Sequence, residues 1–465
     1  MRRPSRRTVL KAIATTGLAG TAGTFVAPPA ATAGRNRSDY DAIVVGAGFA
    51  GVTAARELRR AGLRTLVLEA RNRIGGRTWT DSFMGESIEL GGSWVHETQT
   101  HIWQEISRQE VTVLADSGPD RTIFPVGDGF QFFPPEESFG HQGELVARFC
   151  QGAEEYFPRP HEPLYRADLL RSLDRLTLRD RLNQMGLSAQ DESWLTGITG
   201  GLAGTSTRGA LTQLGHWWAL SGWNAEQYYS LNTFRPQQGM AGILQTMLAD
   251  APPELRLNSP VRTIADDGRR VRVTTVAGQT FAASAVVVAV PVNVWKNIRF
   301  APGLSPERLR ATHQTIGAPH SKKFWMHIRS DIGRSYAYAP EGYPVDTLVP
   351  HRELADGQIM IGFSVHPTLD VSNLAQLQAA VRLIVPDAEV VAARAQDWGR
   401  DPYALGGWSF RRPGQLVDLL AQIQRPQGRI AFATADIASG WSGYVDGAIE
   451  SGLRAASQVA PLVHG

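Results

Sequence analysis

The sequence predicts an α/β protein in which a Rossmann-type unit of parallel strands and helices is interleaved with a region of mixed sheet and helices. A strand, a glycine-rich turn, a helix and a second strand follow one another from residue 40 to residue 68. Apolar runs typical of buried strands return at 285–290 and 429–436, whereas helical periodicity prevails between about 98 and 235. A length of 465 residues suggests two or three ordinary domains or two larger interleaved ones, and 43% hydrophobic with 20% charged residues are typical of a protein that buries a large core.

The first 33 residues predict a twin-arginine signal peptide. Arg6 and Arg7 precede a modestly apolar stretch at 12–27, and an A-x-A cleavage pattern follows at 31–33. We expect residues 34–38 to form a linker and the mature fold to start near residue 39. The twin-arginine route carries folded proteins, so we expect the protein to be exported to the periplasm or the extracellular space.

Charge and cysteine content exclude several classes of function. Five of the 47 basic residues lie in the first 33 positions, so the remaining chain has 42 basic residues against 44 acidic ones and gives no support for nucleic-acid binding. The signal segment is too short and polar for a permanent membrane span, and no later segment has 18 uninterrupted apolar residues. The single Cys150 excludes an intrachain disulfide and a thiolate metal cluster, and no metal site is expected.

The first glycine motif predicts a site for a dinucleotide. Gly46, Gly48 and Gly51 form G-x-G-x-x-G between the strand at 40–45 and the helix at 52–60. The first glycine permits the tight turn, the second a close approach of the backbone to a pyrophosphate, and the third close packing of the helix on the sheet. The helix N-terminus then faces the phosphates with free N–H groups. Glu69, eighteen residues after Gly51, is placed to accept hydrogen bonds from ribose hydroxyls.

A second glycine-rich segment favours FAD over NAD. Gly75 and Gly76 lie among arginines just beyond Glu69, and Arg77 can offer its planar guanidinium to a phosphate. Another glycine pair occurs within 89–94, where the backbone can lie close to a flat ring. These segments resemble the glutathione-reductase-type FAD domain of the flavin monoamine oxidase family. A third motif of that family spans 429–448, and short segments at 157–163 and 222–224 look most like its bacterial nicotine and pseudooxynicotine oxidase branch.

The resemblance implies a Rossmann FAD domain interleaved with a substrate domain. The FAD-binding parts are expected at 39–97, 236–294 and 425–465, and the substrate parts at 98–235 and 295–424. FAD is expected to be non-covalent, because Gly407 is followed by Trp408 where some relatives have the attached cysteine. The residues expected to contact FAD are Gly46, Gly48, Phe49, Ala50, Gly51, Glu69, Ala70, Arg71, Gly75, Gly76, Arg77, Gly91, Gly92, Ser93, Trp94, Val261, Trp398, Ala435, Asp436, Tyr444 and Val445.

Three residues are expected to act in catalysis. By resemblance, Trp408 and Tyr444 form an aromatic cage that holds an amine beside the flavin, an arrangement worth about 0.5–2 kcal/mol for a cationic nitrogen. Lys323 matches the family lysine that holds a water at flavin N5; since side chains alternate along a strand, Lys322 would point away. Asp436 stands where the family usually has Glu, a shorter side chain with the same charge. The C-terminal helix dipole would stabilise negative charge on the reduced flavin.

The resulting hypothesis is an FAD-dependent amine oxidase that transfers hydride from the amine α-carbon to flavin N5. The imine product would hydrolyse, and O2 or a redox protein would reoxidise the flavin. The substrate would be a small amine, nicotine-like or an aromatic or alkyl amine. An L-amino-acid oxidase stays open, with Arg411 or Arg412 to fix a carboxylate, as do a flavin desaturase, a porphyrinogen-type oxidase and a non-enzymatic FAD-binding protein. A homodimer is compatible with the sequence, which does not fix the oligomeric state.

Overall fold

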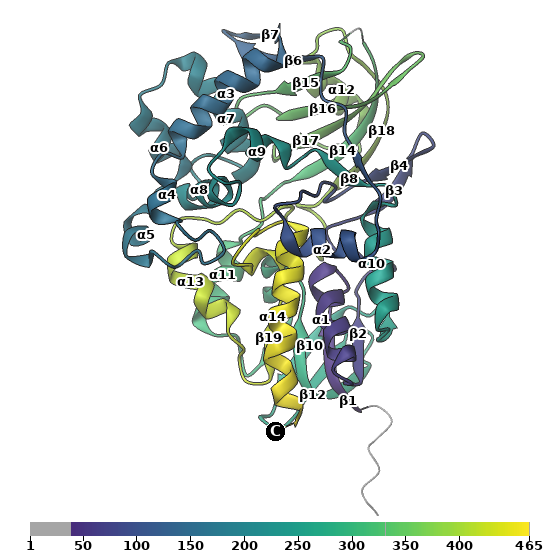
Figure 1. Ribbon diagram of the computed structural model, residues 1–465. Coiled ribbons are helices and arrows are strands. Elements are labelled where there is room, and N and C mark those ends of the chain that lie inside the picture. Colours follow the sequence, from purple (N-terminus) through teal and green to yellow (C-terminus); the bar gives the residue numbers. More distant parts are fainter. Residues whose placement is uncertain (1–38, 331, 465) are drawn as a thin grey trace, which may run out of the picture. The chain divides into compact units, whose positions relative to one another are not determined.

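The computed structural model describes residues 39–330 and 332–464, so the predicted signal peptide and linker lie outside the described residues. The predicted α/β architecture is confirmed, with two large sheets and two short antiparallel pairs of strands (Figure 1). The short pairs are β3 (Thr80–Phe83) with β4 (Glu86–Glu89), and β5 (Val113–Ala115) with β8 (Phe234–Pro236).

The eight-stranded sheet contains the predicted Rossmann unit. Its order is β13 (Arg299–Ala301), β10 (Val261–Asp266), β11 (Val271–Thr275), β12 (Thr280–Val288), β1 (Asp39–Val45), β2 (Thr65–Leu68) and β9 (Glu254–Arg256), and β19 (Ile430–Phe432) also pairs with β12. Strands β12, β1, β2 and β9 are mutually parallel. The chain therefore returns to this sheet from positions far apart in the sequence.

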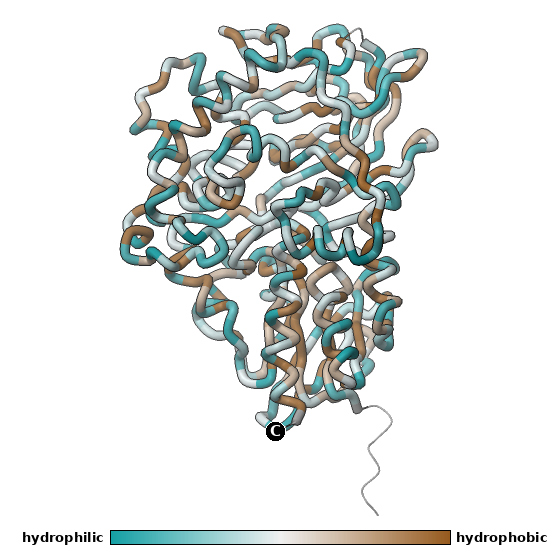
Figure 2. Tube along the Cα trace, in the orientation of Figure 1, coloured by the Kyte–Doolittle hydropathy of each residue, from teal (hydrophilic) through white to brown (hydrophobic). Residues whose placement is uncertain are grey.

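Strand β1 is apolar from Ala42 to Val45, because both faces of the sheet are covered there. Ile43 and Val45 pack into one hydrophobic cluster and Ala42 and Val44 into another, as expected for side chains that alternate along a strand. Figure 2 shows hydrophobic segments along these inner strands and alternating colours along α14 (Val445–His464). Helix α14 packs on α1 (Phe49–Arg60) and on β12.

Three boundaries differ from those expected from the sequence. Helix α1 begins at Phe49 and not at residue 52, because Gly48 already has extended N-cap geometry. Strand β12 starts at Thr280 and ends at Val288, whereas the apolar run predicted a strand at 285–290. The apolar run at 429–436 forms a strand only as far as Phe432, because the Thr434 side chain accepts a hydrogen bond from the Asp436 N–H and starts the short 3-10 helix η2 (Ala435–Ile437).

The seven-stranded sheet belongs to the other region. Its order is β18 (Glu389–Asp397), β14 (Lys322–Arg329), β17 (Gly357–Ser364), β16 (Thr347–Leu354), β15 (Ser335–Tyr338), β6 (Arg121–Val126) and β7 (Gly129–Phe133). In this ladder Lys323 lies opposite Phe363, which in turn lies opposite Thr347. Three neighbouring strands thus bring these side chains to one stretch of the sheet.

Most helices lie between and around these sheets. Those in the middle of the chain are α3 (Pro135–Phe149), α4 (Ala153–Tyr156), α5 (Ala167–Leu173), α6 (Leu178–Met185), α7 (Ala189–Ala203), α8 (Leu211–Leu220) and α9 (Ala225–Ser230). The remaining ones are α2 (Thr100–Arg108), α10 (Gly239–Asp250), η1 (Val292–Asn297), α11 (Pro306–Gln314), α12 (Leu374–Arg382) and α13 (Gln415–Gln424).

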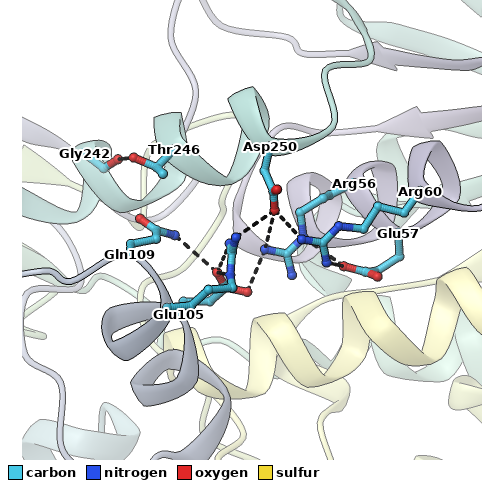
Figure 3. A network of polar contacts seen from close by, with 9 residues as sticks. Arg56, Glu57, Arg60, Glu105, Gln109, Gly242, Thr246 and Asp250 are labelled. Carbon is cyan, nitrogen blue, oxygen red and sulfur yellow. Dashed lines mark hydrogen bonds and ion pairs between the residues drawn. The ribbon is translucent and has the colours of Figure 1, made fainter.

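Ion pairs fasten α2 and α10 to α1 at the edge of the Rossmann unit (Figure 3). Arg56 on α1 is only 4% exposed and pairs with Glu105 on α2 at 2.6 Å. Asp250, the last residue of α10, pairs with Arg60 on α1 and with Arg108 on α2. A buried arginine needs such compensation, because a desolvated charge without a partner is strongly unfavourable.

Candidate active site

A cavity of about 610 Å³ contains nearly all the residues predicted to contact the cofactor. It is lined by the turn before α1, both later glycine pairs, the C-terminal motif, and side chains from the seven-stranded sheet. Gly51 and Asp436 alone among the predicted cofactor residues are not on its wall. Gly51 instead packs on the turn: a Cβ there would lie 2.0 Å from the Gly46 carbonyl oxygen, so the helix can approach the strand only if this residue is glycine.

Glu69 lies at one end of the cavity with both carboxylate oxygens already oriented. It is 3% exposed, and its oxygens accept hydrogen bonds from the Ala47 N–H at 2.7 Å and the Arg71 N–H at 2.8 Å. Each oxygen keeps a further lone pair that can accept a hydroxyl donor. This arrangement fits the ribose of an adenosine.

Next to Glu69, the wall of the cavity is formed by main-chain atoms. Gly48 and Gly75 form a β-bridge, and the Gly75 N–H donates to the Ala47 carbonyl at 2.9 Å. Helix α1 starts here with no acidic residue in its first turn and no side-chain cap. Its N-terminal N–H groups therefore remain available to an anion, as a pyrophosphate requires.

Arg77 makes contacts that the sequence did not predict. Its guanidinium pairs with Asp436 at 2.7 Å and donates to the Gly407 carbonyl at 2.9 Å. Asp436, 1% exposed, also accepts from the Val292 N–H at 2.9 Å. The pair ties the second glycine segment to the C-terminal motif, so Arg77 lines the cavity mainly as a structural link and its guanidinium is shared with a carboxylate.

The N-terminus of α14 borders the cavity through Tyr444 and Val445. Asp446 in its first turn accepts hydrogen bonds from the His101 and Ile102 N–H groups at 2.6 and 3.0 Å. One carboxylate thus lies between the N-termini of α14 and α2, and it offsets part of the positive field predicted for α14.

Lys323 extends from β14 into the cavity. Its Nζ donates to the Gly91 carbonyl at 2.9 Å and to the Ser93 hydroxyl, and lies 4.7 Å from the Trp94 ring centroid. Burial lowers the pKa of Lys323 well below its usual value, against the smaller opposing effect of Glu89. Lys322 points elsewhere: its Nζ donates to the His320 and His366 carbonyls, both at 2.7 Å.

Trp408 and Tyr444 both line the cavity. The Trp408 indole N–H donates to the Leu202 carbonyl at 2.7 Å, and its ring lies 6.2 Å from that of Phe363. The Tyr444 ring packs edge-on against Trp217 at 5.4 Å. Both rings are therefore fixed by neighbours while one side of each remains toward the cavity.

Three residues that were considered for cofactor attachment or carboxylate binding on the basis of the sequence lie away from the cavity wall. Cys150 is fully buried in a hydrophobic cluster. Arg411 is buried and donates to the Ala438 carbonyl, and Arg412 donates to the Thr315 hydroxyl. The arginine that an L-amino-acid oxidase would need is thus not supplied by either candidate.

Several residues of the cavity wall were not predicted from the sequence. Tyr336 and Tyr338 on β15 alternate with small residues, a pattern that could have placed both rings on one face. Phe363 lies opposite Lys323 in the ladder, and Asp346 precedes β16. A lone aspartate before a strand carries no local signal, so only the fold brings it to the cavity.

Within the described residues, no helix is long and apolar enough to cross a membrane, and no group of three or more His, Cys, Asp or Glu side chains is arranged to hold a metal ion.

Known proteins resemble this chain over most of its length. Pseudooxynicotine dehydrogenase from a Pseudomonas species is 36% identical over 439 residues, covering 92% of this chain and 87% of the relative. Nicotine dehydrogenase from Pseudomonas putida is 36% identical, covering 99% and 98%. (S)-6-hydroxynicotine oxidase from Paenarthrobacter nicotinovorans is 28% identical, covering 89% and 97%.

Solved structures share the fold. Putrescine oxidase bound to putrescine superposes with a TM-score of 0.76 at 23% identity, covering 91% of this chain and 99% of that one. Cyclohexylamine oxidase from Brevibacterium oxydans gives 0.74 at 22% identity, covering 92% and 100%. Residues 49–460 match the family described as flavin containing amine oxidoreductase. The chain therefore belongs to this family and is an FAD-dependent amine oxidoreductase.

Proposed function

We propose that the protein is an exported amine oxidase that removes hydride from the α-carbon of a small nicotine-like, aromatic or alkyl amine. The observation that carries this proposal is that Lys323, Trp408 and Tyr444 share one cavity with the glycine-lined cradle and Glu69. FAD, when bound, supplies the hydride acceptor at N5. The imine formed from the amine would hydrolyse to a carbonyl compound plus amine or ammonia.

The residues of the cavity would position the amine and manage its proton. Trp408 and Tyr444 present ring faces that favour the amine nitrogen and fix the orientation of the α-carbon. Lys323, with its lowered pKa, can hold a water and exchange a proton at Nζ under neutral conditions. The rings of Trp94, Trp408 and Tyr444 and aliphatic side chains line the cavity around the place proposed for the amine.

The relatives support a nicotine-like amine as the substrate. Those that are 36% identical are named for pseudooxynicotine and nicotine, and another is named for 6-hydroxynicotine. Two are called dehydrogenases and one an oxidase, so O2 and a redox protein are both proposed as electron acceptors. Comparing reoxidation of the amine-reduced protein by air and by an added redox carrier would distinguish them.

An anaerobic bleaching screen tests the proposed reaction. Purified FAD-loaded protein is mixed with a panel of secondary and primary amines and with L-amino acids, and loss of oxidised-flavin absorbance is followed. We expect bleaching by nicotine-like or other amines and none by amino acids. Bleaching by amino acids alone, or by no amine, would contradict the proposal.

Export is proposed from Arg6 and Arg7. Replacing both by Lys keeps the charge and removes the guanidinium groups that the twin-arginine route recognises, so folded enzyme should remain in the cytoplasm. Amine oxidase activity in the cell fractions is the readout. Undiminished secretion of the double variant would contradict the assignment.

A further inference from the structure

Part of the cavity wall is formed by tyrosines and one aspartate that the reaction above does not use. Tyr228 and Tyr229 come from α9, Tyr336 and Tyr338 from β15, and Asp346 from the residue before β16. The Tyr336 and Tyr338 rings are 5.0 Å apart, and their hydroxyls lie within 3.3 Å of each other. We refer to these four tyrosines and Asp346 as the tyrosine–aspartate wall.

Asp346 is buried without full compensation. It is 6% exposed, and its Oδ2 is among the buried side-chain atoms of the described chain that have no hydrogen-bond partner. Burial raises the pKa of Asp346 to about 7, while the Thr347 hydroxyl, the Val365 N–H and the charge of Lys322 oppose this to a smaller extent. A buried polar atom without a partner costs stability, so its retention in a cavity calls for a ligand that pairs with it.

The surroundings of Asp346 favour a positive ligand. A Cβ on Gly201 would lie 3.4 Å from the Asp346 carboxyl carbon, so the carboxylate lies against the last turn of α7. That turn is the negative end of the helix dipole. The Leu202 carbonyl in this turn accepts a hydrogen bond from the Trp408 indole N–H. The tyrosine–aspartate wall therefore lies close to the predicted amine cage.

The titratable groups that face Asp346 do not neutralise it. Lys322 on β14 is bonded through Nζ to the His320 and His366 carbonyls. From β15, Tyr336 and Tyr338 share the cavity with the carboxylate, and their hydroxyls bond to each other. Burial raises the pKa of both, and the charge of Asp346 adds a smaller contribution. Helix α7 offers Gly201, which has no side chain.

We infer that Asp346 binds a second basic nitrogen of the substrate, remote from the carbon that is oxidised, with the tyrosine rings beside it. This inference rests on the proposed amine oxidation and narrows its substrate class to amines that carry another amine or a pyridine-type nitrogen. The proton is shared between the carboxylate and the nitrogen, so the pair enters the cavity without a net buried charge. Asp346 is a specificity residue and takes no part in the redox step.

Two matched substrate pairs test this inference. 1,4-Diaminobutane is compared with pentylamine, and 4-(3-pyridyl)butylamine with 4-phenylbutylamine; the members of each pair have the same shape and differ by one nitrogen. For the wild type we expect kcat/KM to be higher for the member with two nitrogens, in at least one pair, by about ten- to a hundredfold. This is the size of effect expected for a charge-assisted hydrogen bond. Asp346→Leu should abolish that preference, mainly through KM.

Asp346→Asn separates recognition from a structural role. Its amide can still donate to a pyridine nitrogen but has no charge, so it should keep part of a pyridyl preference and lose a diamine preference. Asp174→Asn is the control, since Asp174 is buried and bonded to Thr212 away from the cavity, and it should leave both ratios unchanged. FAD content confirms folding.

The outcomes separate the two proposals. Oxidation of both members of each pair at equal kcat/KM, or a preference that survives Asp346→Leu, would overturn the role of Asp346 and leave amine oxidation intact. Failure of every amine to bleach the flavin would overturn the proposed function itself.

Discussion

The eight-stranded and seven-stranded sheets both contribute to the cavity, but they leave buried polar groups in different states. On the eight-stranded side, Glu69 accepts two backbone N–H bonds, and Asp436 pairs with Arg77. On the seven-stranded side, Lys323 has a lowered pKa, and Asp346 has a raised pKa and an oxygen without a partner. We therefore propose that the first side holds the cofactor, whereas the second keeps titratable groups for the substrate.

The largest effect that would sharpen this comparison is expected at Lys323. Lys323→Met removes the group proposed to hold a proton near the reacting atoms, so reoxidation of the flavin should slow by roughly 10²-fold. Lys322→Met is the matched control, because its Nζ is bonded to two carbonyls outside the cavity and reoxidation should stay near wild type. Stopped-flow mixing of reduced enzyme with acceptor measures both; a slow Lys322→Met with a normal Lys323→Met would show that the wrong lysine was chosen.

Loss of the Trp408 or the Tyr444 ring should slow reduction of the flavin by the amine and not its reoxidation. Trp408→Ala and Tyr444→Ala remove rings that orient the amine, and misalignment of the α-carbon can slow flavin reduction by about a hundredfold. Trp295→Phe, in the core and away from the cavity wall, serves as a control for loss of a buried indole. Wild-type reduction rates in both cage variants would remove the cage from the mechanism.

Glu69→Ala should act on the cofactor alone. The variant loses charge-assisted hydrogen bonds worth about 1.5–3 kcal/mol each, so FAD affinity should fall by about ten- to a hundredfold. The Ala47 and Arg71 N–H groups also lose their acceptor, which adds to the effect. Titration of the apoprotein with FAD gives the Kd, and an unchanged Kd would mean that Glu69 is not a ribose ligand.

The last expected effect is a pH-dependent change in stability from Asp346. Its pKa is raised to about 7 in the fold from 3.8, so the folded protein binds more protons than the unfolded chain between these values. Stability from this group therefore falls as the pH rises from about 4 to about 7, by an amount on the order of a few kcal/mol. Asp346→Asn should raise the Tm relative to wild type more at pH 8 than at pH 5.

Asp128→Asn is the control for this Tm measurement, because Asp128 is exposed. Its Tm should differ from that of the wild type by the same small amount at both pH values. A pH-independent difference for Asp346→Asn would contradict the raised pKa.

Local patterns predicted the cofactor side much better than the substrate side. The Rossmann unit depends on glycines, a helix and an acid that are neighbours in the sequence, so spacing was enough to predict Gly46, Gly48 and Glu69 at one cavity. Alternation along β14 predicted that only one of Lys322 and Lys323 would face the cavity, and the family resemblance, not the alternation, pointed to Lys323.

The features that sequence could not provide depend on distant parts of the chain. Arg77 meets Asp436 only because the second glycine segment packs on the C-terminal motif. Asp346 reaches the cavity because β16 lies beside β17 and the end of α7 packs on it, and neither contact leaves a local pattern. The apolar run at 429–436 also indicated a longer strand than the one that forms, because the Thr434 cap ends it.

A paired measurement of FAD affinity and of anaerobic flavin reduction in Glu69→Ala and Trp408→Ala tests the division between the two sides most directly. We predict that Glu69→Ala binds FAD about ten- to a hundredfold more weakly yet, at saturating FAD, is reduced by amine at the wild-type rate. Trp408→Ala should bind FAD normally and be reduced about a hundredfold more slowly. If each variant lost both properties together, the separation of a cofactor side from an amine side in this cavity would be contradicted.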